Sequence, residues 1–507
     1  MYWQGVLKTI SGILGVVGCC MLTSVPVGWL MGDHGKTLMW MTIASLIPLC
    51  LGIAGSKSIR RMEYRWGFRE GFGIATFGWI LTAAAGALPF VLIADLTWTD
   101  AYFESMSGFT TTGASIISPD LRLRNGSFLT EGLESLPACL LYWRSMTHWL
   151  GGMGIVVLSV AILPFLGIGS QAMVAAEVPG PTSDNITPRI ADSAKILWGV
   201  YILLSIMETI LLMAGGMSLF DAWCHTCGTM ATGGFSTRAA SVGAFRSAYI
   251  DWVITLFMFL AGCNFVLHFQ ALKGRLYAFW KDEEFRFYLF VILVGSLIVC
   301  CSLWLRGDPI EVTTGEKIEP TLSAVLRFGA FQVVSLITTT GFCTANFDCW
   351  APDVRILLVV FMFFGGCGGS TGGGIKHSRI ILGLKYILQQ IRRSLFPHHL
   401  TDIRLNGKRV SNHIVHRTLG FIIQFVCLFI LGALLVGALP GFDSQTAVTA
   451  SIACLGNIGP GLGKVGAICT YAWIPWPGKW LLCFLMLLGR LELYTVMVVF
   501  LPSFWRR

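Results

Sequence analysis

The sequence predicts an all-α polytopic membrane protein. We expect four pseudo-repeats of helix, short re-entrant half-helix and helix, preceded by two extra transmembrane helices at the N-terminus. Composition is the first of three observations that predict this fold class: only 12% of the 507 residues are charged, 55% are hydrophobic, and the mean hydropathy is +0.70. Soluble domains carry about 25% charged residues. Apolar stretches also recur along the whole chain, and Gly- and Thr-rich turns recur between them.

The spanning helices are predicted from the apolar stretches, because a helix needs about 20 apolar residues to cross a bilayer. The candidates lie near 9–31, 37–55, 73–96, 144–166, 195–217, 248–270, 286–305, 353–390, 416–438 and 476–502. The first lacks a small-residue cleavage site, so we expect a retained helix and not a removed signal. The stretch 353–390 is too long for one span, and glycines interrupt it in the middle.

The orientation is predicted from the basic residues, because cytoplasmic loops of membrane proteins collect Lys and Arg. An N-terminus inside the cell puts the basic loops and the C-terminus on the cytoplasmic side. The residues concerned are Lys57, Arg60, Arg61, Arg65, Arg69, Lys273, Arg275, Lys281, Arg392, Arg393, Arg404, Lys408, Arg409, Arg506 and Arg507. The net charge of +9 therefore indicates topology, and no nucleic-acid partner is predicted.

Four external connections each hold a short apolar stretch followed by a Gly- or Thr-rich turn. They are residues 99–118, 220–238, 323–347 and 443–463. None is long enough to span, so each is predicted to be a re-entrant half-helix that returns as extended chain. We expect Asp100, Asp221 and Asp443 to be the N-caps of three half-helices, and Thr321 or Ser323 that of the third along the chain.

The turns form an internal repeat when they are aligned on one glycine each. They are Ser-Gly-Phe-Thr-Thr-Thr-Gly (107–113), Thr-Met-Ala-Thr-Gly-Gly-Phe (229–235), Ile-Thr-Thr-Thr-Gly-Phe (337–342) and Leu-Gly-Asn-Ile-Gly-Pro-Gly (455–461). The alignment on Gly113, Gly233, Gly341 and Gly459 gives a period of roughly 110–120 residues. The predicted units are an N-terminal extension at 1–71 and pore repeats at 72–194, 195–285, 286–415 and 416–507.

The chemistry of these turns favours a cation pore. Irregular backbone is too costly to face lipid, so the four turns must line one polar cavity. Rings of carbonyl oxygens can replace the hydration shell of a monovalent cation. Glycine permits the backbone angles that such a ring needs, and the C-terminal ends of the half-helices are partly negative. A single turn would be an ordinary loop, whereas four at matched positions predict one central pore. The three acids are expected to be caps and not ion ligands.

The break in the eighth span is predicted to be a gate below the filter. Its residues are Gly365, Gly366, Cys367, Gly368, Gly369, Ser370, Thr371, Gly372, Gly373 and Gly374. A phosphate-binding loop is disfavoured, because Ile375 separates the last glycine from Lys376 and no strand precedes the loop. The loop starts about 18 Å down a helix that begins at Pro352. Lys376, His377, Ser378 and Arg379 are expected to follow it at the cytoplasmic face.

Arg490 lies at the same depth, about 18 Å down a helix that begins at Gly478. This is just past the middle of a hydrocarbon core of about 30 Å. A charge at this depth is functional by default. Pairing with Glu492 is disfavoured, because residues two apart face different sides of a helix. We therefore expect Arg490 to point into the pore as an electrostatic barrier to cations.

Other functions find little support in the sequence. An enzyme would need a cluster of titratable groups, but those inside the apolar stretches are scattered: His148, Glu208, His268, Arg490 and Glu492. Cys224-His-Thr-Cys227 has a redox spacing but no thioredoxin-like βαβ pattern around it. His398-His399 has no further metal ligands nearby in sequence and is expected to be a solvated loop. A receptor without flux would leave the four turns unexplained.

The turns resemble the filters of the Trk/Ktr/HKT superfamily of potassium transporters, over the whole chain. The motifs are Phe-Thr-Thr-Thr-Gly-Ala-Ser (109–115), Ala-Thr-Gly-Gly-Phe-Ser-Thr (231–237), Thr-Thr-Thr-Gly-Phe (338–342) and Asn-Ile-Gly-Pro-Gly (457–461). The extra N-terminal pair of helices is similar to the TrkH/TrkG branch. The resemblance implies potassium bound by Thr111, Thr112, Gly113, Ala231, Thr232, Gly233, Thr339, Thr340, Gly341, Asn457, Ile458 and Gly459. Gly113, where relatives that pass sodium tend to have serine, favours potassium.

The resemblance also implies the setting and the partners. We expect low-affinity potassium uptake across the bacterial inner membrane, by a homodimer that a cytosolic TrkA-like ring controls. Such a ring binds NAD and ATP, so a nucleotide acts only through the partner. The loop at 365–374 and Arg490 match the family's intramembrane loop and arginine. Coupling stays open: the absence of a clearly poised membrane acid favours a channel, and symport with H⁺ or Na⁺ is the alternative.

Overall fold

We describe the fold from a computed structural model. The structure describes residues 3–58, 68–129, 131–152, 154, 190–396 and 402–506. Several sequence predictions lie outside these ranges: Arg60, Arg61, Arg65, Arg507, the pair His398-His399 and the end of the span predicted at 144–166.

The all-α polytopic fold class is confirmed. In the described ranges, six helices are long and apolar enough to cross a membrane, or eight if two bent helix pairs are included. The long helices are α1 (Trp3–Leu22) continued by α2 (Ser24–Leu30), α3 (Gly35–Ser58), α4 (Phe68–Ile93), α9 (Ile190–Ala214), α14 (Glu283–Arg306) and α18 (Asn412–Gly437). Shorter elements of the described chain are η1 (Gly132–Ser135), η2 (Ser241–Phe245), α13 (Tyr277–Lys281), η3 (Phe347–Cys349) and η4 (Gly463–Val465).

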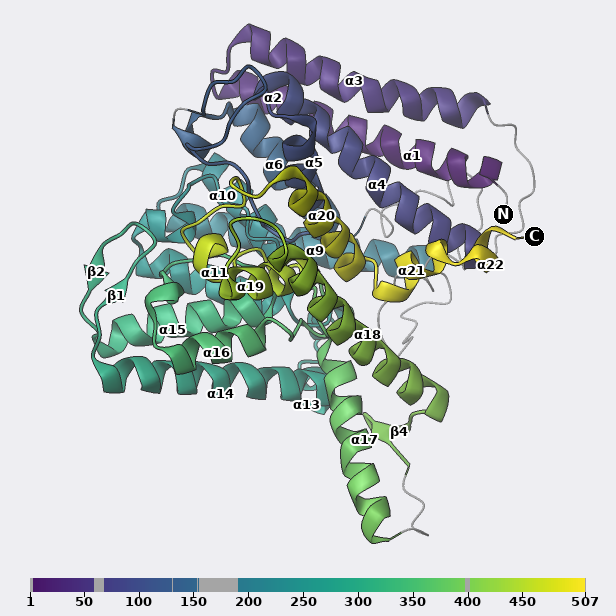
Figure 1. The fold of residues 1–507 in the computed structure, drawn as a ribbon, viewed down its shortest axis with the longest axis vertical. Helices are drawn as coiled ribbons and strands as arrows, with labels where there is room; N and C mark the ends of the chain where they lie inside the picture. Colours follow the sequence, from purple (N-terminus) through teal and green to yellow (C-terminus); the bar gives the residue numbers. More distant parts are fainter. Residues whose placement is uncertain are drawn as a thin grey trace.

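The four predicted half-helices are present between longer helices of the described chain. They are α5 (Trp98–Phe109), α10 (Leu219–Met230), α15 (Leu322–Ile337) and α19 (Ser444–Leu455). We call them the pore helices. Nearly all residues of α5 and α10 are buried, so the pore helices form the centre of the protein and the long helices surround them (Figure 1).

Two of the expected N-caps were wrong. Thr321 and Asp443 do cap α15 and α19, but Thr97 and Ser218 cap α5 and α10. In both latter helices the acid lies three residues after the cap, and its backbone N–H donates to the hydroxyl of Thr97 or Ser218. The hydroxyl also donates to the carboxylate, at 2.6 Å from Thr97 to Asp100. The pattern Ser/Thr-x-x-Asp is a variant of the capping box, in which the Ser or Thr is the cap. This pattern is present in the sequence and identifies the correct caps.

Three spans are broken. The eighth separates into α16 (Pro352–Phe361) and α17 (His377–Leu395) around residues 362–376, as predicted. Two spans expected to be continuous are bent: α11 (Ala248–Ala261) meets α12 (Phe265–Leu272) at 101°, and α20 (Trp476–Arg490) meets α21 (Leu493–Met497) and η5 (Val498–Phe500) at 119°. The first bend is fixed by Asn264, whose side chain caps α12 through the N–H of Val266. The second passes through Glu492, whose φ is +56°.

The two faces of the protein are distinguished by what lies at each end of the helices. At one end, β1 (Ile310–Glu311) and β2 (Lys317–Ile318) form an antiparallel hairpin near the starts of the pore helices. We call this the mouth face. Both chain ends lie at the opposite end, which we call the terminal face (Figure 1). There Trp3 stacks on Trp505 of α22 (Pro502–Trp505) with ring centroids 5.5 Å apart.

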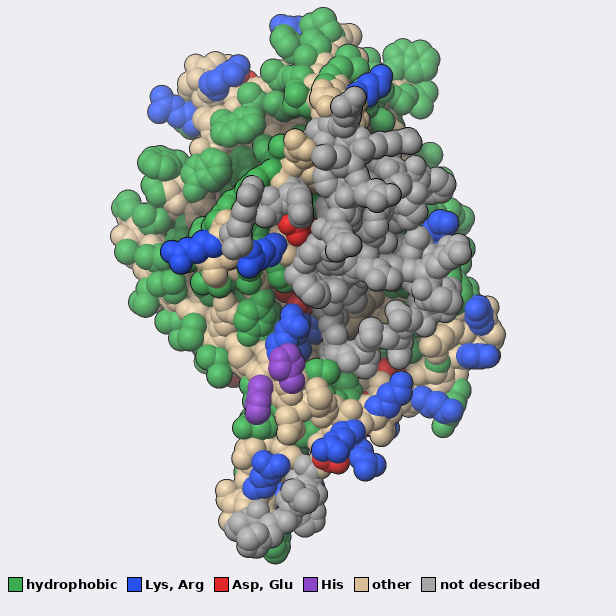
Figure 2. Space-filling view, turned by 90° about the vertical axis from the view of Figure 1, so that its right-hand side faces the viewer, with side chains coloured by type: hydrophobic (Ala, Val, Ile, Leu, Met, Phe, Trp, Pro, Cys, Tyr) green, Lys and Arg blue, Asp and Glu red, His purple; other side chains and the backbone are tan. Residues whose placement is uncertain are grey.

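The terminal face carries a projection made of α17 and the hairpin of β3 (Arg404–Leu405) and β4 (Lys408–Arg409). Figure 2 shows this face, where Lys and Arg side chains gather toward the projection. Arg392, Arg393, Arg404, Lys408 and Arg409 are exposed there. A cluster of exposed positive charge therefore lies on the same face as the chain ends.

The N-terminal extension packs tightly on itself. A Cβ added at Gly52 of α3 would lie 2.7 Å from the carbonyl oxygen of Ser11 and would overlap Gly15 of α1. Small residues allow such close approach between helices in a membrane. Helix α6 (Ala138–Gly152) then joins this part of the protein to the pore, since it lies against both α2 and the pore helices α5 and α10.

Candidate functional site

The turns that follow the pore helices have one backbone conformation. In each, a left-handed residue lies two positions after the last helical residue, and a glycine of positive φ follows two positions later. The left-handed residues are Thr111 (φ 52°), Thr232 (53°), Thr339 (60°) and Asn457 (55°). The glycines are Gly113 (78°), Gly234 (78°), Gly341 (78°) and Gly459 (98°). Glycine is needed at the second position because residues with a side chain adopt such angles at a cost.

The predicted alignment of the second turn on Gly233 was wrong by one residue. The backbone N–H groups of Thr112, Gly233, Thr340 and Ile458 each donate to the carbonyl oxygen five residues earlier, at 2.8–2.9 Å. These bonds make Gly234 the equivalent of Gly113, and they move Ala231 to the position of Thr110. Two successive glycines hid the register. The signal that finds it is the pair Gly234-Phe235, which matches Gly341-Phe342.

The four glycines close a ring. A Cβ added at Gly113 would overlap the carbonyl oxygen of Gly233, one at Gly234 that of Thr340, and one at Gly341 that of Ile458. The ring closes because a Cβ at Gly459 would lie 2.6 Å from the carbonyl oxygen of Thr112. Each turn therefore touches the next in chain order, and the fourth returns to the first. Four segments far apart in the sequence thus meet around one centre.

With the corrected register, each turn supplies one oxygen-bearing side chain at the left-handed position. Thr111, Thr232, Thr339 and Asn457 are all fully buried. The hydroxyl of Thr111 and Oδ1 of Asn457 have no hydrogen-bond partner among the described residues. Buried polar atoms are rarely left without a partner. These two unsatisfied oxygens fit a cation as their missing partner, whereas the hydroxyls of Thr232 and Thr339 are engaged with protein groups.

A buried ion pair braces the first two turns from behind. Arg144 of α6 lies 2.7 Å from Glu104 of α5, and both side chains are almost fully buried. Oε2 of Glu104 accepts from the N–H of Ile116 at 2.9 Å, and Nη1 of Arg144 donates to the carbonyl of Ser236 at 2.9 Å. The pair therefore connects the extended strands that follow Gly113 and Gly234. No sequence motif indicated this contact.

The other two turns are supported by uncharged hydrogen-bond donors in place of an ion pair. Ser335 donates to the carbonyl oxygen of Phe342 at 2.7 Å, and Tyr471 donates to that of Gly459 at 2.7 Å. The ring is thus closed and has one backbone geometry, while its supports differ from turn to turn.

The loop at 362–376 lies directly below the ring, at the C-terminal ends of three pore helices. Thr371 donates to the carbonyl oxygen of Met230 in α10 at 3.0 Å. The N–H of Gly373 donates to the hydroxyl of Thr339 at 2.7 Å. A Cβ at Gly373 would also meet Asn457, after α19, at 2.9 Å. The predicted segment 365–374 therefore lies directly under the four turns.

Arg490 reaches this loop from the end of α20. Its Nη1 donates to the carbonyl oxygen of Thr371 at 2.7 Å, and its Nη2 to those of Gly151 at 2.6 Å and Gly152 at 2.9 Å. Glu492 is paired with Arg379 at 2.7 Å. The side chain of Arg490 thus connects α20, the loop and α6.

A second cation lies with Arg490 and was missed. Lys376 is buried and its Nζ donates to the carbonyl oxygen of Gly372. His377 and Ser378 are buried as well. The expectation that residues 376–378 lie at the cytoplasmic face was wrong, because the chain enters α17 while it is still inside the protein. Nothing in the local sequence distinguishes this lysine from a surface lysine.

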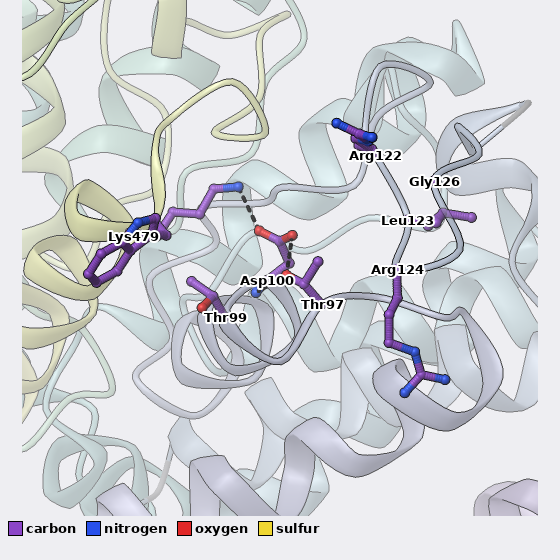
Figure 3. A pocket seen from close by; sticks show the side chains of 9 residues that line it. Thr97, Thr99, Asp100, Arg122, Leu123, Arg124, Gly126 and Lys479 are labelled. Atoms are coloured by element: carbon purple, nitrogen blue, oxygen red, sulfur yellow. Dashed lines mark hydrogen bonds and ion pairs between the residues drawn. The ribbon is translucent and has the colours of Figure 1, made fainter.

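The acids at the starts of the pore helices hold the fold together at the mouth face. Asp100 pairs with Lys479 of α20 at 2.6 Å, and both side chains are buried (Figure 3). They lie at the edge of a cavity of about 540 Å³ that Arg122, Arg124 and Trp476 also line. Asp221 accepts from Thr237 at 2.6 Å and pairs with Arg238 at 3.2 Å. Both carboxylates are engaged with protein groups.

The candidates for other chemistry stay apart. Among the described residues, no group of three or more His, Cys, Asp or Glu side chains could hold a metal ion. Cys224 and Cys227 are free and buried within α10. His148 stacks on Phe235 beside the second turn, with ring centroids 3.9 Å apart. Fold and site together define the class: a multi-pass membrane protein in which four re-entrant segments form one closed ring above an intramembrane loop.

Comparison with known proteins gives the family. The family model TrkH, described as a cation transport protein, matches residues 39–507. The Trk system potassium uptake protein TrkH of Halomonas elongata is 39% identical over 99% of both chains. That of Salmonella typhimurium is 41% identical over 86% of both. The crystal structure of the potassium transporter TrkH from Vibrio parahaemolyticus superposes with a TM-score of 0.85, at 34% identity and full coverage of both chains.

The chain therefore belongs to the TrkH family of cation transport proteins. The resemblance predicted from the four turns is confirmed at the level of the family. Transport of a cation through a membrane is not an enzymatic function.

Proposed function

We propose that this protein takes up potassium across the bacterial inner membrane, through the ring formed by its four turns. The observation that carries the proposal is the closed ring itself, with one oxygen-bearing side chain from each turn at an equivalent, buried position. The names of the relatives support potassium as the ion, since they are called potassium uptake proteins or a potassium transporter.

The proposed binding residues follow the structural register. They are Thr111, Thr112, Gly113, Thr232, Gly233, Gly234, Thr339, Thr340, Gly341, Asn457, Ile458 and Gly459. Compared with the set expected from the sequence, Gly234 joins the second turn and Ala231 leaves it. Backbone carbonyls and these side-chain oxygens replace water around a dehydrated ion. The C-terminal ends of the pore helices add negative potential below it.

The proposed direction of uptake rests on charge. The terminal face carries the exposed basic residues of the α17 projection, and basic residues collect on the cytoplasmic side of membrane proteins. The mouth face is then outside the cell. Potassium enters at the mouth, passes the ring and meets the loop at 365–374, which Arg490 holds in its closed position. The positive charge of Arg490 adds an electrostatic barrier at this level.

The proposed assembly is a homodimer that works with a cytosolic TrkA-like ring binding NAD and ATP. Helix α17 supports a protein contact of this kind, because it projects from the body (Figure 1). It exposes apolar side chains on this projection: Leu384, Ile387, Leu388, Ile391 and Leu395. Exposed apolar patches of this kind mark surfaces that contact another protein or the membrane.

Symport with protons is the second candidate, and one observation favours it. Glu208 of α9 is fully buried, and neither of its carboxylate oxygens has a hydrogen-bond partner in the part of the chain that the structure describes. An ionisable group inside a membrane span is a candidate proton site. A reversal potential that shifts with pH at constant potassium would support coupling, and one that ignores pH would support a channel.

Uptake of rubidium into proteoliposomes tests the proposal. The purified protein should accumulate rubidium down an imposed gradient, and external potassium should compete with it. Liposomes that hold the variant Gly113→Ala, which narrows the ring, serve as the matched control. Absence of uptake by wild-type protein that elutes as a folded species would refute potassium transport.

A further inference from the structure

One buried carboxylate connects the loop under the ring to the helix that follows the loop. Glu284 lies in the first turn of α14 and is buried, with 8% of its surface exposed. Its Oε1 accepts from the N–H of Gly368 at 2.7 Å and from the N–H of Ser378 at 2.8 Å. Gly368 belongs to the loop, and Ser378 to the first turn of α17. A single oxygen atom thus fixes the loop relative to the helix that leaves it.

The two residues before Glu284 bind the projection on the terminal face. Glu283 pairs with Lys385 of α17 at 2.5 Å. Asn406, between β3 and β4, accepts from the N–H of Glu283 at 2.7 Å and donates to the carboxylate of Asp282 at 2.9 Å. Lys385 also donates to the carbonyl oxygen of Arg404 at 2.6 Å. Three consecutive residues, 282–284, therefore touch the hairpin, α17 and the loop.

The outer contacts, to the hairpin and α17, are weaker than the inner contacts of Glu284 to the loop. Asn406 is exposed and the Glu283–Lys385 pair is partly exposed, so these bonds compete with water and are weak. The bonds of Glu284 are buried and charge-assisted, so they are strong. A molecule that binds the hairpin can therefore break the outer contacts at little cost. Loss of the outer contacts then leaves the first turn of α14 free to shift, and Glu284, which holds the loop, shifts with it.

We propose that residues 282–284 form a relay, through which displacement of the β3–β4 hairpin or of α17 on the terminal face releases the loop at 365–374. In this relay Glu284 is a positioning residue: it sets the position of the loop and contacts no ion. The inference rests on the proposed function of that loop as a gate. It adds which contact transmits a signal from the exposed surface to the gate.

The test reads the position of the loop without relying on flux. Cys367 lies in the loop and is 1% exposed. Its modification by a water-soluble maleimide, measured by mass spectrometry of its peptide in the full-length protein in nanodiscs, reports release of the loop. Rubidium flux in proteoliposomes is measured in parallel. The variants are Glu284→Ala, Glu284→Gln, Lys385→Met and Asn406→Ala. Glu316→Gln is the control, because Glu316 forms an exposed pair with Arg246 at the mouth face.

Glu284→Ala should raise the labelling rate of Cys367 by roughly tenfold or more, since it removes two bonds to a charged acceptor. Glu284→Gln, which keeps an acceptor oxygen, should restore slow labelling in part. Lys385→Met and Asn406→Ala should each accelerate labelling in the wild-type background but add nothing to Glu284→Ala. Glu316→Gln should leave labelling unchanged.

The relay is overturned if Lys385→Met and Asn406→Ala leave labelling unchanged, or if their effects add fully to that of Glu284→Ala. Thermal unfolding of each variant separates these results from misfolding, because an unfolded protein exposes the other buried cysteines as well. If labelling follows the predicted pattern while no variant carries rubidium, the relay stands and the proposed transport function fails.

Discussion

Arg490 donates a hydrogen bond of 2.7 Å to the carbonyl oxygen of Thr371. This bond joins α20 to the loop under the ring, and the second amino group of Arg490 continues the connection to Gly151 of α6. Thr371 in turn donates to the end of α10. The contact explains how a loop rich in glycine is held in one place, and it gives the arginine a structural role in addition to its charge.

Replacement of Arg490 by alanine should open the pore. It removes three hydrogen bonds to backbone carbonyls, each worth about 1.5–3 kcal/mol for a charged donor, and it removes the positive charge below the ring. We expect rubidium flux and single-channel current to rise several-fold. The variant Arg490→Lys keeps the charge but loses the planar set of N–H donors. Its flux and current should lie between those of the wild type and those of Arg490→Ala. An unchanged current in Arg490→Ala would show that Arg490 is not a barrier to cations.

Deletion of residues 367–373 should leave a pore that cannot close. The deletion removes Thr371 and Gly373, which contact Met230 and Thr339 below the ring, but leaves the ring intact. Flux should become constitutive while the preference among cations stays that of the wild type. The measurement is open probability in planar bilayers. Normal closure of the shortened chain would rule out the loop as the gate.

The glycines of the ring should not tolerate a methyl group. Gly234→Ala forces a side chain against the carbonyl oxygen of Thr340 at a φ of 78°, and the left-handed backbone alone costs about 1–2 kcal/mol. Rubidium uptake should fall by at least tenfold. Gly126→Ala is the matched control, because Gly126 has a φ of 86° and a Cβ there would meet nothing within 4 Å. Equal uptake by both variants would contradict the assigned register.

Loss of the brace behind the first two turns should destabilise the protein and its selectivity. Glu104→Ala leaves Arg144 buried without its carboxylate, and breaking a buried pair costs about 3–5 kcal/mol. We expect a clear fall in Tm and weaker discrimination of potassium from sodium. Asp353→Asn breaks an exposed pair with Arg306, which is worth about 0–1 kcal/mol, and should change neither quantity. Unaltered selectivity in Glu104→Ala would show that the ring needs no such support.

Local patterns in the sequence predicted the repeats well. The half-helices, their turns, the glycine loop and the level that Arg490 shares with this loop all follow from apolar length and glycine content, which act over short stretches. The breaks at Gly262–Asn264 and at Glu492 were not predicted, because hydropathy is continuous across them. In the sequence, a polar residue at a bend cannot be distinguished from a single polar residue inside a straight spanning helix.

Contacts between distant segments could not be predicted in this way. The Glu104–Arg144 pair joins residues 40 positions apart, and the bonds of Glu284 to Gly368 and Ser378 join residues 84 and 94 positions apart. Burial of Lys376 also depends on these tertiary contacts. The register of the second turn failed for a different reason: two adjacent glycines both fit the repeat, and the sequence distinguishes them only through Phe235, which matches Phe342 and follows Gly234.

The proposed function requires that the ring conducts potassium selectively. The most direct measurement is the reversal potential of the chain lacking residues 367–373, recorded in a planar bilayer with a potassium gradient opposed by a sodium gradient. The proposed function predicts a sustained current whose reversal potential lies near the equilibrium potential for potassium. A reversal potential at the sodium value or near zero, or no current from folded protein, would contradict it.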